Sequence, residues 1–248
     1  MGDLLLGFVM GIANLLPGIS GGTIVFVSGK YRLFVSAVAD LLRFKIAREE
    51  VLFLLKIGIG AAVSIALLSK IVDHLYSSFP IQTTSFFAGL IAGGLFLLWK
   101  GIRFGFLPSV MMALGALSMV GLESITGGNL EPGAFQLILG GFIAGGTMIL
   151  PGVSGSSMLV LLGLYDDAIS AVANLDFLKL LWIGIGAILG ILAVSILMKE
   201  LVERFENETV SFLYGLTLAG LIYIVSSSAS VPFLLLGFAA MIILSRVI

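Results

Sequence analysis

The sequence contains no cysteine, a single histidine and few charged residues. The absence of cysteine excludes disulfides, thiolate nucleophiles and cysteine-ligated metals. No cluster of histidine and carboxylate residues offers another metal site, so none is expected. Charged residues make up 11% of the 248 residues, whereas a typical soluble domain carries about 25%. No basic stripe interleaved with aromatic residues is present, so nucleic acid is not an expected partner.

Apolar residues dominate instead, at 59% of the chain with a mean hydropathy of +1.20. Because so little charge cannot cover a water-exposed surface, the composition predicts a polytopic membrane protein. The first residues, MGDLLLGF, lack the basic start and cleavage site of a signal peptide, so the first apolar segment is expected to stay in the mature protein. Six continuous apolar runs are predicted to be transmembrane helices: 51–72, 83–100, 104–122, 179–198, 209–227 and 231–247.

Two further apolar segments, 7–29 and 141–163, are each interrupted by Pro-Gly at the centre. They are copies, because 15 of 35 positions are identical at a shift of 134 residues. Further along the shift becomes 126, since the second copy lacks the stretch RFKIAREE (43–50). The sequence therefore predicts two repeats, 1–125 and 135–248, which together form one integral membrane domain.

The distribution of Lys and Arg indicates whether the interrupted segments cross the membrane. If each is a re-entrant hairpin, each repeat has three crossings and the repeats are inverted. In that topology only Lys70 and Lys179 fall on one side of the membrane, and the other eleven of the 13 Lys and Arg residues fall on the opposite side. If the segments cross the membrane instead, nine Lys and Arg residues fall on one side and four on the other. The positive-inside rule favours hairpins with both termini in the cytoplasm. Each hairpin arm is predicted to have about ten residues, roughly 15 Å of helix.

The predicted fold class is thus an all-α polytopic membrane protein with two inverted repeats, each one re-entrant helical hairpin plus three transmembrane helices. The alternative interpretation is that Pro-Gly only kinks packed helices. Paired hairpins whose tips meet at the membrane midplane are a recurring transporter design. The tips contain the sequences SGGT (20–23) and SGSS (154–157), which offer backbone N–H groups and hydroxyls. Such groups at the start of a helix bind anions, so an anionic group is predicted to pass between the tips.

Enzymatic activity is not expected. The stretch GISGG (18–22) matches the serine-hydrolase pattern G-x-S-x-G, but that site needs a histidine base, and His74 lies in a polar loop. Lys30 and Arg32 are predicted either to attract the anion at the cytoplasmic mouth or to set the topology alone. Arg43, Lys45 and Arg48 in the inserted stretch are interpreted as part of an interfacial basic helix that attracts anionic lipid headgroups.

The segments GIANLLPGISGGTIVFVSGKY and GGTMILPGVSGSSMLVLLGLYDD resemble the two signature segments of the polyprenyl-phosphate (undecaprenyl-phosphate) transporter family of bacteria and archaea. The resemblance covers essentially the whole chain. It implies that the protein returns a phosphorylated polyprenyl carrier across the cytoplasmic membrane for reuse in envelope glycan synthesis. Two departures stand out. Asn14 replaces the usual Asp, which puts in doubt a proton-coupling role there, and Arg32 and Asp166 stand where a Glu commonly follows the tyrosine.

The predicted function is therefore translocation of a polyprenyl-phosphate lipid, with that lipid and the surrounding membrane lipids as partners and no cofactor. The alternative is a secondary transporter or channel for a small soluble anion; a scaffold would leave the duplicated tips unexplained. Chain length of the carrier, coupling ion, direction and oligomeric state, a homo-oligomer included, are left open. The predicted substrate-binding residues are Asn14, Pro17, Gly18, Ser20, Gly21, Gly22, Thr23, Tyr31 and Arg32 in the first repeat, and Pro151, Gly152, Ser154, Gly155, Ser156, Ser157 and Tyr165 in the second.

Overall fold

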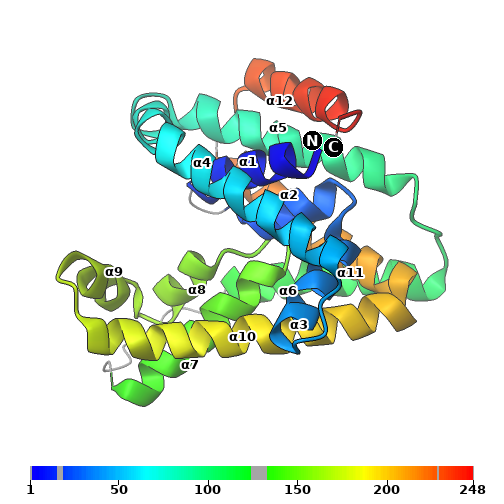
Figure 1. The fold of residues 1–248 in the computed structure, drawn as a ribbon. Helices are drawn as coiled ribbons and strands as arrows, with labels where there is room; N and C mark the ends of the chain where they lie inside the picture. Colours follow the sequence, from blue (N-terminus) through cyan, green and yellow to red (C-terminus); the bar gives the residue numbers. More distant parts are fainter. Residues whose placement is uncertain (1, 16–18, 124–132, 228, 248) are drawn as a thin grey trace.

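The computed structural model describes residues 2–15, 19–123, 133–227 and 229–247, and every regular element in these ranges is a helix (Figure 1). The predicted all-α membrane class is confirmed. The first half contains α1 (Gly2–Asn14), α2 (Gly21–Val27), α3 (Tyr31–Leu42), α4 (Arg48–Ser78), α5 (Pro80–Trp99) and α6 (Phe106–Glu123). The second half contains α7 (Ala134–Ile149), α8 (Gly155–Leu161), α9 (Tyr165–Ala173), α10 (Phe177–Arg204), α11 (Glu206–Ser227) and α12 (Val231–Leu244).

Each of the six predicted spans falls largely in one helix. Helix α4 continues beyond its predicted span and includes His74, so the expectation that His74 lies in a loop is wrong. Four of these helices, α4, α5, α10 and α11, are long and apolar enough to cross a bilayer. The other two, α6 and α12, are shorter apolar helices. The two halves therefore share one order of elements: an apolar helix, two short helices, two long helices and a closing apolar helix.

Both interrupted segments break into two helices, as predicted. The first break lies between α1 and α2, with Pro17 and Gly18 outside the described residues, and the second lies between α7 and α8. The return arms α2 and α8 have only seven residues each, so the expectation of ten-residue arms is wrong. Glycine ends both arms early. Gly29 and Gly163 adopt left-handed φ values of 78° and 70°, a conformation that closes a helix and redirects the chain.

The same helix pairings occur in both halves. Helix α1 packs along α4 and α7 packs along α10, whereas α5 packs along α12 and α6 along α11 (Figure 1). Close backbone contact makes these pairings, because a Cβ on Gly7 would meet the Ile57 carbonyl, and a Cβ on the equivalent Gly141 would meet the carbonyl of Ile183. The closing helix of each half thus packs on the other half, which interlocks the two.

One contact breaks this symmetry. Helix α3 packs on α10, and the equivalent pair, α9 and α4, makes no contact of comparable extent among the described residues. Helix α2 is buried along its whole length, but α8 is partly exposed. The two halves therefore follow the same chain path, but their equivalent helices pack against different neighbours.

Candidate functional site

The two Pro-Gly breaks lie against each other. The Thr23 hydroxyl oxygen accepts the Gly152 N–H at 2.9 Å, and the Tyr31 hydroxyl donates to the Ile149 carbonyl at 3.1 Å. A Cβ on Gly22 would lie 2.7 Å from the Met148 carbonyl oxygen. Residues separated by more than a hundred positions along the chain are thus brought together.

Most donors of the first tip are already used within the protein. Ser20 is the N-cap of α2, and its hydroxyl oxygen accepts the Thr23 N–H at 3.3 Å and lies 3.0 Å from the Thr23 hydroxyl. The Asn14 side-chain oxygen accepts the Gly21 N–H at 2.6 Å. Asn14 therefore fixes the break between α1 and α2, a role that a neutral amide oxygen fills as well as a carboxylate.

The second tip keeps its donors available. Ser154 is the N-cap of α8, but its hydroxyl lies 2.7 Å from the Ser156 hydroxyl and does not cap the helix. The N–H groups of Gly155, Ser156 and Ser157 have no acceptor within the part of the chain that the structure describes. Ser156 is exposed, and Ser154 and Ser157 are half-buried. Hydroxyl and N–H donors at one accessible turn can bind the oxygens of an anion.

Tight backbone packing holds the second tip in place. Pro151 is buried, and Gly152 adopts a φ of 88° with its backbone against Leu216 of α11. A Cβ on Gly155 would lie 2.6 Å from the Ala144 carbonyl of α7. The sequence PGVSG therefore gives a turn in which backbone rather than bulky side chains meets neighbouring helices.

Two predicted site residues lie apart from the tips. Arg32 is exposed and has its ion-pair partner, Glu206, at 3.7 Å. Tyr165 begins α9 with 38% of its surface exposed, and its hydroxyl has no hydrogen-bond partner in the described ranges, unlike that of Tyr31. Lys30, the other predicted cation, donates to Asp3 at 2.6 Å, and this hydrogen bond is the main cause of the lowered pKa of Asp3.

Sequence reasoning missed an ion pair that docks α3 on α10. Lys199 Nζ lies 2.5 Å from Asp40 Oδ2, with side chains only 19% and 16% exposed. Asp40 lies in the last turn of α3. The available signal was a charged residue within an apolar helix on each side, since such residues are retained when they pair.

Fold and site together define a polytopic helical membrane protein with two broken repeats that meet at polar Pro-Gly turns. The sequence profile of the VCA0040-like, undecaprenyl phosphate translocase-like family matches residues 10–232, and the chain belongs to this family. It is 33% identical over 228 residues to a polyprenyl-phosphate transporter of Vibrio cholerae, covering 87% of this chain and 74% of the relative. It is 29% identical over 238 residues to a polyprenyl-phosphate transporter of Staphylococcus aureus, covering 88% and 84%. No solved structure gives a significant match.

Proposed function

We propose that this protein translocates a polyprenyl-phosphate lipid across the cytoplasmic membrane by transport rather than catalysis. The supporting observation is the family match across residues 10–232, which includes both tips, together with two relatives that are named for this transport. Moving a phosphate through hydrocarbon is costly unless protein groups replace its water. The polyprenyl tail can remain in the lipid while the headgroup passes between the halves.

The headgroup is bound first at the second tip. The hydroxyls of Ser154, Ser156 and Ser157 and the free N–H groups of the first turn of α8 are the accessible donors. Thr23 and Gly152 lie directly behind them and join this tip to the first. The buried first tip is the closed counterpart of the same site.

The two repeats are inverted, and their asymmetry corresponds to one of two alternating states. Tyr31 bonds the Ile149 carbonyl, so the 134-residue shift assigns Tyr165 to the Leu15 carbonyl in the opposite state. We call each of these tyrosine hydrogen bonds a latch. In the present structure the Tyr31 latch is formed and the Tyr165 hydroxyl is free among the described residues. Exchanging the latches would bury the second tip and expose the first.

The ion pair between the halves, in contrast, has no charged equivalent, because an amide and a carboxylate occupy the corresponding positions. The shifts of 134 and 126 carry Asp40 and Lys199 onto Asn174 and Asp73. Asn174 is the C-cap of α9 and Asp73 lies on α4, and these two helices are not docked here. With both termini in the cytoplasm, as the charge distribution favours, this structure is open toward the outer face.

Proteoliposomes that contain radiolabelled polyprenyl phosphate test the proposal. A membrane-impermeant phosphatase added outside hydrolyses outer-leaflet lipid only, unless the protein brings the inner-leaflet lipid within reach. Wild-type protein should therefore expose the whole lipid pool. The double variant Ser154→Ala/Ser156→Ala should slow this exposure, whereas Ser118→Ala, whose exposed hydroxyl bonds the Leu114 carbonyl of its own helix, should not. Uptake of free phosphate without any lipid exposure would instead support the soluble-anion transporter.

A further inference from the structure

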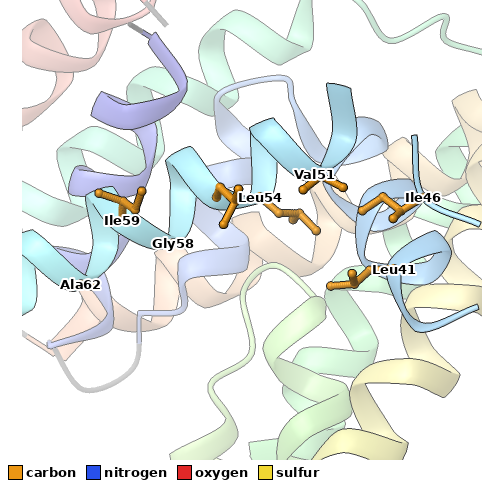
Figure 2. A pocket seen from close by; sticks show the side chains of 8 residues that line it. Leu41, Ile46, Val51, Leu54, Gly58, Ile59 and Ala62 are labelled. Carbon is orange, nitrogen blue, oxygen red and sulfur yellow. The ribbon is translucent and has the colours of Figure 1, made fainter. Parts of the chain in front are cut away.

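A groove runs along the outer surface of α4, where α4 meets the end of α3 (Figure 2). Its volume is about 440 Å³, and it is open along one side. Leu41 and Ile46 form one wall, and Val51, Leu54, Gly58 and Ile59 of α4 form the other. The lining is apolar throughout, and the α4 wall extends to Ala62, which corresponds to roughly 16 Å of helix.

The groove lies on a different face of α4 from the one that packs on α1. Helix α4 presents Ile57 and Ala61 to α1, where the glycines of α1 contact them. Gly58 and Ala62 each follow one position later, about 100° further around the helix. The groove is therefore separate from the proposed headgroup path between the halves.

In the described part of the chain, cations without an ion-pair partner gather at the end of the groove where α4 begins. Arg43 and Lys45 lie on the link between α3 and α4, and Arg48 is the first residue of α4, so the basic helix predicted here is wrong for the link itself. All three side chains are exposed and have no ion-pair partner within the described residues. The carboxylates near them are Glu49, which is exposed, and Glu50, which accepts the Ala47 N–H at 3.0 Å. The link thus has an excess of positive charge at the end where α4 begins.

An exposed aromatic ring is found beside these cations. Phe44 stands between Arg43 and Lys45 with 96% of its surface exposed, held by a left-handed φ of 56°. An aromatic ring among cations is typical of a segment lying at the membrane interface, with the ring in lipid and the cations at the headgroups. This arrangement places the charged end of the groove at headgroup level.

Comparison of the halves shows that the groove is an addition to the repeat. The link between α9 and α10 is short, and there Asp176 caps α10 by accepting the Lys179 N–H at 3.1 Å. The inserted stretch 43–50 of the first half supplies both the Ile46 wall and all three cations. The second repeat folds without such an insertion, so we expect the insertion in the first repeat to have a function other than folding.

We propose that this groove binds one acyl chain of an anionic phospholipid of the cytoplasmic leaflet, with its phosphate at Arg43, Lys45 and Arg48. The apolar length of the groove fits a hydrocarbon chain, and the cations at one end fit an anionic headgroup. The bound lipid supports the end of α3, which carries Asp40, and so favours the docked position of α3 on α10. Binding itself does not depend on the proposed transport function.

Native mass spectrometry of the purified full chain tests this proposal, with phosphatidylglycerol and phosphatidylcholine as probes. The wild type should retain phosphatidylglycerol in preference to phosphatidylcholine. Gly58→Leu should fill the groove and reduce this binding, since nothing lies within 4 Å of a Cβ at that position. The matched control is Gly184→Leu at the equivalent position of α10, which is equally open and should bind as the wild type does.

Charge gives an independent variant. Replacing Arg43, Lys45 and Arg48 with Gln should lower the affinity for phosphatidylglycerol by at least roughly tenfold, and high salt should weaken wild-type binding through screening. Equal retention of both phospholipids, or wild-type binding by both Gly58→Leu and the charge variant, would overturn the proposal. So would loss of polyprenyl phosphate but not phosphatidylglycerol from Gly58→Leu, because the groove would then hold the prenyl tail. If Gly58→Leu does not fold, the charge variant and the salt dependence decide.

Discussion

Replacing Tyr31 with Phe removes the hydroxyl that joins the start of α3 to the end of α7. The ring is 96% buried, its hydroxyl donates to the Ile149 carbonyl at 3.1 Å, and it packs edge-on against Phe26 at 5.7 Å between centroids. Phe keeps this ring packing, so the substitution isolates one hydrogen bond. Such a bond contributes about 1 kcal/mol net, which changes the ratio of two states about fivefold.

The direction of the effect distinguishes a latch from a stabilising contact. Tyr31→Phe weakens the state seen here and should shift the protein toward the opposite state. Tyr165→Phe removes the equivalent hydroxyl, which is free here and is proposed to bond Leu15 in the opposite state. It should therefore shift the protein toward the present state. The two substitutions should act in opposite directions by similar factors.

A single thiol can report the shift, because the chain has no cysteine. Ser156→Cys lies on the exposed second tip, and its rate of reaction with an impermeant maleimide follows the population of the present state. The expected order of labelling rates is Tyr165→Phe fastest, then the parent, then Tyr31→Phe. Equal rates in all three proteins, or the reverse order, would falsify the proposed exchange of latches.

Other predictions follow from single contacts. Gly22→Ala should impair folding and transport more than Gly21→Ala. The Cβ at position 22 would meet a backbone carbonyl at 2.7 Å, whereas the Cβ at position 21 would meet side chains of Met10 and Asn14, which can shift. Thermal unfolding of both variants checks this, and equal losses of stability would contradict it. Asp40→Asn should lower the free energy of unfolding by roughly 1–3 kcal/mol, because it removes the short ion pair of the mostly buried Lys199 and leaves its longer contact to Glu203 at 3.9 Å. The reversed pair Asp40→Lys/Lys199→Asp should recover part of the loss, and no change in denaturant midpoint would refute this. Phe44 and Leu175 occupy matching left-handed positions after α3 and α9, and their side chains are 96% and 64% exposed. If the repeats are inverted, these positions lie on opposite sides of the membrane, so an impermeant maleimide on intact cells should label Leu175→Cys and not Phe44→Cys. Labelling of both from one face would mean that the repeats are parallel.

The sequence by itself determined the class of protein, the approximate positions of the long apolar helices and the presence of two broken repeats. These features depend on local properties: hydropathy sets the spans, and Pro and Gly interrupt helices wherever they occur. The early end of the return arms was also readable, because Gly29 and Gly163 are glycines at the position where a helix closes in left-handed conformation. The expectation of ten-residue arms used segment length and overlooked that signal.

Only the tertiary structure decided how the two copies differ. SGGT and SGSS predict equivalent tips, yet the first is buried and internally bonded while the second keeps free donors. The difference comes from contacts between distant elements, such as Thr23 with Gly152 and Asp40 with Lys199, and from the exchange of α6 and α12 between the halves. Local sequence cannot show it, because two related segments with 15 of 35 identical positions acquire different surroundings only when the whole chain packs.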